Sequence, residues 1–439
     1  MNQTNSINNK QKKMKQKLLL MMALFAAIAT GMMTTSCENI DSPVDEPAVQ
    51  PTELPAARIT ETIRKEEAKA TVYNIEYPSV DPYGKPITLS GSIIVGDEVV
   101  EAGKQAKGMV LYNHFTVFQR DQCPSRGDLA ILLKVVGSSL IAVAPDYYGF
   151  GVTADKNQAY CLSRTNAQAS IDCLLAAREL LADKGFAWGD LLFNLGYSQG
   201  AQTALAVLRY CTEKHPEIKF THTVAGAGPY DIGETYRQLI SAGETSMPST
   251  VISVLLAYNQ YYNMGIADSD LFLEPTLSNI PTYLLSKDYK REELEPKLAT
   301  TKIADWIAPS LLDFNSSLSK SFMNVFEAEN LSKGWTPRPE ERIVLVHNKL
   351  DACVPYANTT QMANFFKEQG FKVDMEYTYN RYEDGKVFVF PITLPALSPK
   401  MGTHETGALP FITELITVLC HYLDIKPWFT ITAEELDGV

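Results

Sequence analysis

One serine in the sequence has glycines two positions away on either side, in Gly196-Tyr197-Ser198-Gln199-Gly200. This pattern is typical of a nucleophilic serine on a sharp turn between a strand and a helix, where glycines prevent clashes between the two elements. The motif alone is a weak signal, so its surroundings decide its weight. The apolar run Leu191–Leu195 predicts a strand directly before it, and Ala201–Tyr210 predicts a helix directly after it. We therefore predict that Ser198 is a nucleophile for acyl transfer.

A serine hydroxyl is a poor nucleophile at neutral pH and needs a base. On a turn of this kind the serine is followed along the chain first by an acid and then by a histidine. Of the six histidines, His404 and His421 come last in the chain. His421 lies in an apolar helical stretch, where we expect it to pack, whereas His404 lies in a loop just before the last predicted helix. We therefore predict His404 as the base.

The base needs a carboxylate that holds its tautomer and stabilises the imidazolium. Asp351 closely follows the predicted strand Ile343–Val346, so it should lie at the same edge of the sheet as the serine. We predict Asp351 as this acid. Three acidic residues further along the chain are alternatives: Asp374, Glu376 and Asp384.

Acyl transfer also needs two N–H donors for the oxyanion. We expect one from the backbone of Gln199, next to the nucleophile, and the other from the loop that follows the predicted strand Gly108–Tyr112. In that loop Thr116 is the first choice and Phe115 the second. We expect His114 to orient the loop rather than to act as a second base.

Strands and helices alternate around these residues. Further predicted strands are 71–77, 88–95, 140–144, 221–225 and 373–379, the first two as an antiparallel hairpin. Further predicted helices are 128–136, 165–181, 357–368 and 406–423. This alternation, with continuous apolar strands, predicts an α/β fold with a mainly parallel central sheet and helices on both faces.

One long stretch, 230–340, contains helical segments rich in Tyr, Leu and Met but no convincing strand. An insertion of this length in an α/β domain is usually a lid or cap. We therefore expect core segments at 65–229 and 341–439, with a helical cap at 230–340 between them.

The N-terminus resembles the signal of a bacterial lipoprotein. Lysines at 10–17 precede the apolar run Leu18–Gly31, and small residues then lead to Cys37. The resemblance implies a signal peptide at 1–36, lipidation of Cys37, and a membrane-anchored protein at the outer membrane, on the periplasmic or cell-surface face. The proline-containing segment 37–64 is expected to be a disordered tether.

The formal net charge of −12 makes nucleic-acid binding an improbable function, because an acidic chain repels phosphate backbones. The sequence has no H-E-x-x-H motif, no P-loop and no paired cysteine site, so no metal or cofactor is expected. Gly149–Ala154 matches a relaxed dinucleotide-binding pattern, but no helix opens within it.

Four segments of the sequence together resemble those of the α/β-hydrolase superfamily, in particular of secretory-lipase-like bacterial lipoprotein esterases. They are Asn113–Thr116, Pro145–Gly151, the Ser198 turn, and Asp351 with His404. The resemblance implies a serine hydrolase that cleaves a small-molecule, lipid or glycan ester through an acyl-enzyme, without a cofactor. The sequence departs from many relatives at His114-Phe115, where they have His-Gly, and near His347, where they have glycine. We expect the second departure not to touch the triad.

Two other functions fit the same residues. One is an aminopeptidase-like peptidase, which would need carboxylates in the cap to hold a substrate amine. The candidates for that role are Glu234, Glu244, Asp268 and Asp270. The other is a non-catalytic surface-binding lipoprotein on a hydrolase scaffold.

Overall fold

The structure is a computed structural model that describes residues 56–66, 69–100, 105–127, 139–375, 382–397 and 402–425. Several predictions therefore lie outside the described residues: the signal peptide 1–36, the lipidation of Cys37, and the helix 128–136. The structural account below concerns the described residues alone.

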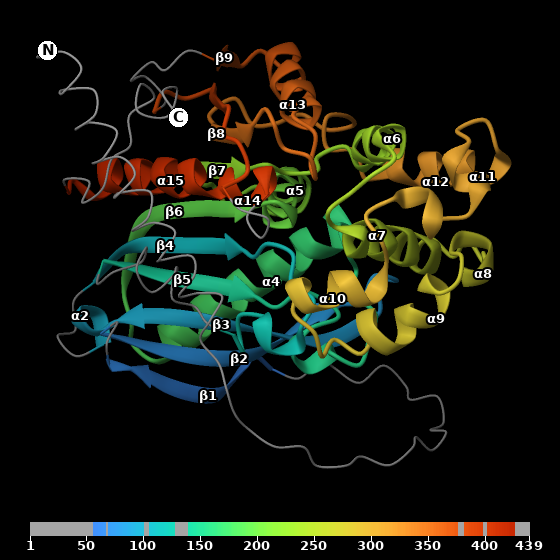
Figure 1. The fold of residues 1–439 in the computed structure, drawn as a ribbon. Helices are drawn as coiled ribbons and strands as arrows, with labels where there is room; N and C mark the ends of the chain where they lie inside the picture. The colour runs from blue at the N-terminus through green and yellow to red at the C-terminus, as the bar shows by residue number, and fades with distance from the viewer. Residues whose placement is uncertain are drawn as a thin grey trace, which may run out of the picture. The chain divides into compact units, whose positions relative to one another are not determined.

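A ten-stranded sheet forms the centre of the described part of the chain, in the order β1-β2-β3-β5-β4-β6-β7-β8-β10-β9 (Figure 1). The strands are β1 Arg58–Lys65, β2 Ala70–Val80, β3 Pro86–Gly96, β4 Ala106–Asn113, β5 Leu140–Pro145, β6 Trp188–Tyr197, β7 His222–Gly226, β8 Arg342–Asn348, β9 Lys372–Asp374 and β10 Lys386–Ile392. Neighbours from β5 to β9 in this order pair in parallel, and β1, β2 and β3 pair antiparallel. The predicted mainly parallel sheet and its antiparallel entry hairpin are confirmed.

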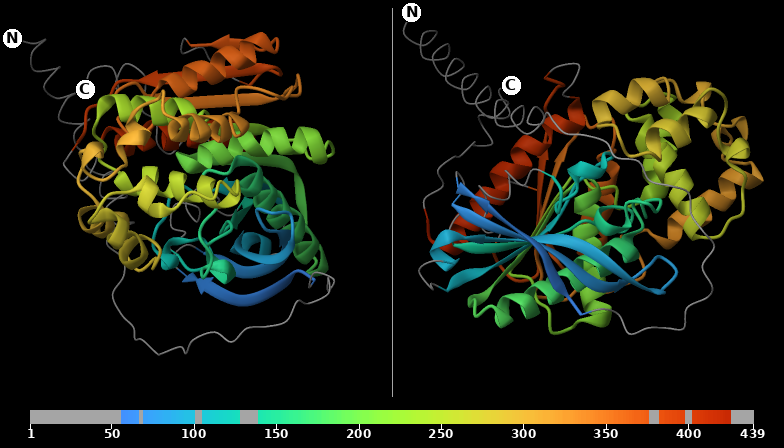
Figure 2. Two further views of the ribbon diagram at one scale, coloured as in Figure 1. Left: turned by 90° about the vertical axis from the view of Figure 1, so that its right-hand side faces the viewer. Right: turned by 90° about the horizontal axis from the view of Figure 1, so that it is seen from below.

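Helices cover both faces of this sheet (Figure 2). The core helices are α2 Asp97–Val100, α4 Ser163–Asp183, α5 Gln199–Lys214, α13 Ala357–Glu368, α14 Thr403–Thr406 and α15 Ala408–Leu423. The pair α4 and α5 packs on one face and α15 on the other, and this explains why strands such as β5 and β7 are buried along their whole length. The predicted α/β fold class is confirmed.

Between β7 and β8 the chain is helical and contains no strand in residues 227–341, all of which the structure describes. Its α-helices are α6 Ile232–Ala242, α7 Pro248–Tyr261, α8 Asp268–Leu271, α9 Thr276–Asn279, α10 Arg291–Leu298, α11 Pro309–Leu312 and α12 Ser317–Ala328. We call residues 230–340 the cap. In Figure 1 the cap helices lie beyond the arrowheads of β4, β5 and β6, where the carboxyl ends of the parallel strands meet.

Three strands differ from the sequence predictions. Residues 58–64, predicted as the end of the tether, form most of β1, which pairs with β2 and is largely exposed. An edge strand of this kind is held by backbone hydrogen bonds, so it carries little of the apolar pattern on which prediction depends. The strand expected at 373–379 corresponds to β9, which ends at Asp374; residues 376–381 are not among the described residues. The strand β10 was not predicted at all.

The last helical stretch, Thr403–Leu423, is long and apolar enough to cross a membrane by length and composition. Within its most apolar 18-residue window 78% is buried inside the protein, and the stretch packs on β6, β7 and β8. That burial is typical of a core helix, and it places residue 404 at the start of an element fixed to the sheet.

Candidate active site

Ser198 lies at the turn between β6 and α5, as the motif predicts. Its backbone has φ 57° and ψ −123°, a left-handed conformation that costs energy for a residue with a side chain. A Cβ at Gly196 would lie 2.0 Å from the carbonyl oxygen of Gly200, and a Cβ at Gly200 would lie 2.1 Å from that of Asn113. Both glycines are therefore required by close backbone approach, and the turn presents the hydroxyl at the carboxyl edge of the sheet.

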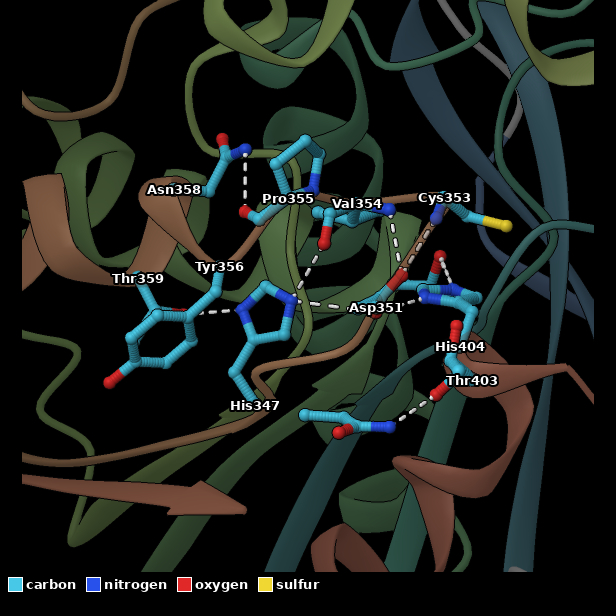
Figure 3. A network of polar contacts seen from close by, with 12 residues as sticks. His347, Asp351, Cys353, Val354, Pro355, Tyr356, Asn358, Thr359, Thr403 and His404 are labelled. Carbon is cyan, nitrogen blue, oxygen red and sulfur yellow. Dashed lines mark hydrogen bonds and ion pairs between the residues drawn. The ribbon is translucent and has the colours of Figure 1, made fainter. Parts of the chain in front are cut away.

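His404 lies in α14 and contacts both of the residues predicted to act with it. Its Nε2 is 2.9 Å from Ser198 Oγ. Its Nδ1 is 2.6 Å from Asp351 Oδ2 (Figure 3). Because a carboxylate only accepts, Nδ1 carries the hydrogen and Nε2 is free to accept from the serine. The hydroxyl of Tyr197 donates to the carbonyl of His404 at 2.5 Å, which fixes the backbone of α14 beside the serine turn.

Asp351 lies in the turn after β8, with its side chain fully buried. Its Oδ1 accepts the backbone N–H groups of Cys353 and Val354, at 2.9 and 2.8 Å, so the carboxylate orientation is set by its own turn. Burial alone would raise the pKa of this carboxyl. The charge of His404 and hydrogen bonds from His347 and His404 instead hold the pKa well below its usual range.

The pKa of the predicted base, His404, is shifted in the opposite direction. Burial alone would lower the pKa of His404, but the Asp351 carboxylate, 2.6 Å from its Nδ1, raises that pKa above the usual value. An ionised acid next to a histidine with a raised pKa is the arrangement expected of a general base that becomes an imidazolium during the reaction.

The alternative acids lie elsewhere. Asp374 faces Lys386 at 3.4 Å, and Asp384 forms an ion pair with Arg342. Glu376 lies outside the described residues. Of the described candidates, the structure therefore brings Asp351 to the histidine.

The predicted oxyanion donors lie on two neighbouring backbone segments. Gln199 is the first residue of α5, so its N–H has no carbonyl partner within the helix. The close approach of Gly200 to the carbonyls of Asn113 and His114 places the loop after β4 beside the serine turn. In that loop the Thr116 hydroxyl is 2.8 Å from the Tyr160 hydroxyl, and Phe115 is 39% exposed.

His114 has the loop-orienting position expected of it. The ring is buried and stacks on Tyr147, with Nδ1 2.7 Å from the carbonyl of Phe115 and Nε2 3.1 Å from that of Asp146. Burial lowers the pKa of His114. A neutral imidazole has one N–H, and when Nε2 carries it the ring donates to the Asp146 carbonyl, which joins the loop after β4 to the turn after β5.

The prediction that the departure at His347 does not touch the triad is wrong. His347 lies near the end of β8, and its Nε2 is 3.4 Å from Asp351 Oδ2. The contact does not follow from the order of residues in the chain, because His347 precedes the acid whereas the base of such a site follows it. The four-residue separation across a strand end was the available signal.

The cap reaches the site through two side-chain contacts. Arg291 of α10 pairs with Glu405 at 2.8 Å, one residue beyond the predicted base. Ser246 Oγ lies 3.4 Å from Cys353 Sγ, in the turn that holds Asp351. The cap therefore contacts both elements that carry the acid and the base.

The glycine-rich segment after β5 has a structural role. A Cβ at Gly151 would lie 1.8 Å from Ser90 Oγ and 2.2 Å from Asp146 Oδ2. Asp146 itself accepts from the hydroxyls of Ser90 and Ser125 at 2.6 and 2.5 Å. These contacts account for Gly151 of the relaxed dinucleotide pattern. Within the described residues, no group of three or more His, Cys, Asp or Glu side chains could hold a metal ion.

Comparison with known proteins places this chain among ester hydrolases. The sequence model of the secretory lipase family matches residues 125–387, more than half of the chain. No curated protein is significantly similar in sequence.

Solved structures share the fold at low sequence identity. A protein described as a hydrolase from Legionella pneumophila is 20% identical, with a TM-score of 0.68 over 86% of this chain and 100% of that chain. The rice cell wall degrading esterase LipA from Xanthomonas oryzae is 19% identical, with a TM-score of 0.66 over 84% and 98%. Candida antarctica lipase A in its closed state is 12% identical, with a TM-score of 0.61 over 88% of both chains. All three comparisons support the same α/β architecture.

Proposed function

Because this chain belongs to the secretory lipase family, and is therefore a carboxylic ester hydrolase, we propose that it cleaves its ester through Ser198, His404 and Asp351. The observation that carries the proposal is the continuous relay from Ser198 Oγ to His404 Nε2, at 2.9 Å, and from His404 Nδ1 to Asp351 Oδ2, at 2.6 Å. Family membership also favours ester hydrolysis over the peptidase and non-catalytic alternatives.

In the proposed acylation step, Ser198 Oγ attacks the ester carbonyl carbon while His404 Nε2 takes the hydroxyl proton. The imidazolium that forms is stabilised by Asp351, which stays ionised because its pKa is held low. The negative charge on the carbonyl oxygen is placed against the N–H of Gln199 and the N–H of Thr116, with Phe115 as the alternative second donor. His404 then protonates the departing alcohol, which leaves an acyl group on Ser198.

Deacylation repeats the same proton transfers with water. His404 removes a proton from the water as its oxygen attacks the acyl carbon, and returns the proton to Ser198 Oγ as the carboxylic acid leaves. Neither step requires a group beyond the side chains and backbone donors named here.

The test uses a fluorophosphonate probe that reacts with activated serines, together with p-nitrophenyl ester turnover. The wild type should be labelled and active, and Ser198→Ala should lose labelling and at least about 10⁴-fold in kcat. Ser321→Ala, on the cap helix α12, is the matched control and should behave like the wild type. An unlabelled but folded wild type, or a Ser198→Ala variant that still turns over ester, contradicts the proposal.

We also propose that the exported chain is lipidated at Cys37, because the segment before this residue resembles a lipoprotein signal. Mass spectrometry of protein from the membrane fraction should find an N-terminal acylated cysteine. Cys37→Ala should remove the modification and release the protein from the membrane. An unmodified Cys37 in the mature wild type contradicts the proposal.

A further inference from the structure

A second histidine lies behind the proposed acid. His347 belongs to β8, and its side chain is fully buried, so it meets neither solvent nor substrate. Figure 3 shows its ring between Thr359 on α13 and the turn that contains Asp351 and Val354. The ring of Tyr356 packs against it with its centroid 5.6 Å away, in an edge-on arrangement.

The hydrogen of His347 can be placed from its partners. Nε2 lies 2.9 Å from the carbonyl oxygen of Val354, which can only accept, so Nε2 carries the hydrogen. In the neutral ring Nδ1 then accepts from the Thr359 hydroxyl, 2.7 Å away. Both ring nitrogens therefore have partners, and the single N–H is directed at the acid's turn.

This N–H lies close to the acid as well as to the carbonyl. Nε2 is 3.4 Å from Asp351 Oδ2, the same oxygen that accepts from His404. Val354 completes a ring of contacts, because its own N–H donates to Asp351 Oδ1 at 2.8 Å while its carbonyl accepts from His347. The carboxylate is thus held on one oxygen by the turn backbone and flanked on the other by two imidazoles.

We propose that His347 is a positioning residue for the acid. It fixes the turn through Val354 and directs Asp351 Oδ2 toward His404 Nδ1, and its N–H dipole favours the ionised carboxylate. The inference rests on the proposed function, since it assigns His347 a role only if Asp351 serves His404. It predicts that His347 acts on the rate of the chemical step and not on substrate binding.

The experiment compares His347→Leu, which removes the donor, with His347→Gln, whose side-chain amide can again donate to Val354. Activity is expressed per active site, counted by fluorophosphonate titration, so loss of folded protein does not count as loss of rate. The control is His222→Leu, because His222 is an equally buried histidine on the neighbouring strand β7, at the end remote from the triad.

We expect a fall of about 10- to 100-fold in kcat for His347→Leu, the size expected when a hydrogen bond near a charged group is lost. KM should stay within about twofold of wild type. His347→Gln should recover most of the rate, and His222→Leu should keep kcat within about twofold.

Wild-type kcat per titrated site in His347→Leu overturns the inference, as does a Gln variant that is no better than the Leu variant. Loss of titratable sites with a normal rate at those that remain shows a purely structural role and also overturns it. Failure of the proposed function is distinguishable, because the wild type itself would then not be labelled at Ser198.

Discussion

The core and the cap are built in different ways, although both border the same site. In the core, Ser198 and Asp351 of the proposed triad directly follow strands of the sheet, and His404 lies in α14, which contacts β8 and the sheet-packed helix α15. The cap has no strand, and three of its helices have four residues each. Such short helices have little stability of their own, so the cap depends on its packing and on side chains that reach the core.

Lys287 is the clearest example of a cap side chain that holds the cap to the core. Its Nζ donates to the carbonyls of Gly149 and Ala154, at 2.6 and 2.9 Å, and also to that of Lys156. A single buried cation of the cap thus satisfies three acceptors of the loop after β5. The proposed catalytic residues are thus positioned by the sheet, whereas the cap is joined to the core by side-chain hydrogen bonds such as those of Lys287.

The largest effect is expected from a core change that leaves the cap intact. Asp351→Asn removes the charge that stabilises the His404 imidazolium and favours the wrong tautomer, so kcat should fall about 10³- to 10⁴-fold. Steady-state kinetics with esters of short and long acyl groups should show the same fall for each. A fall that depends strongly on acyl length would mean that the acid also shapes the cap.

A cap change should act on stability and selectivity instead. Lys287→Met removes a charged donor from three buried carbonyls. The free energy of unfolding, measured by urea denaturation, should therefore fall by about 1–3 kcal/mol. The ratio of kcat/KM between long and short acyl esters should change, while Ser198 remains reactive to the fluorophosphonate probe. Lys320→Met, at an exposed position of α12, is the control and should leave both measurements unchanged. Unchanged stability in Lys287→Met would contradict the role of this attachment.

The pH profile should depend on the ionisation of His404 and not on the acyl group of the ester. Since the pKa of His404 is raised above the usual value and the neutral ring is the active base, kcat/KM should rise with pH along an acid limb centred above pH 6.5. Below that limb the rate should fall about tenfold per pH unit. The ionisation of Asp351 should not change kcat/KM in this pH range, because the pKa of Asp351 is held low. An acid limb that moves from one acyl length to another would break the separation between core and cap.

The smallest effect is expected where the two regions meet, at Arg291 and Glu405. The pair is partly exposed, with side chains 24% and 20% accessible, so its loss should change stability by less than about 1 kcal/mol. Glu405 raises the pKa of His404 and Arg291 lowers it. Glu405→Gln should therefore move the acid limb to lower pH, and Arg291→Gln should move it to higher pH. Shifts in the same direction for both variants would contradict a simple charge effect.

The core could be predicted from sequence because its signals are local. The strand before Ser198, the helix after it and the order of Asp351 and His404 follow from patterns within a few residues of each. The contact of His347 with Asp351 could not be predicted in this way, since it depends on how the turn after β8 folds back on the strand.

The missed elements have equally specific causes. The strand β1 is mostly exposed, so composition pointed to a tether, and β10 follows a polar segment and contains Pro391. The cap could be recognised as helical, but its attachments, such as the three carbonyls around Lys287, join residues more than a hundred positions apart. Such pairs leave no periodic pattern in the sequence.

The position of β7 in the sheet has a consequence for biogenesis. Its neighbour β8 is synthesised more than a hundred residues later, because the whole cap lies between them. A chain that emerges from its N-terminus therefore presents the unpaired edge of β7 until β8 arrives, and an open edge of this kind invites pairing with other chains. The long insertion between β7 and β8 therefore lengthens the interval during synthesis in which the edge of β7 stays unpaired.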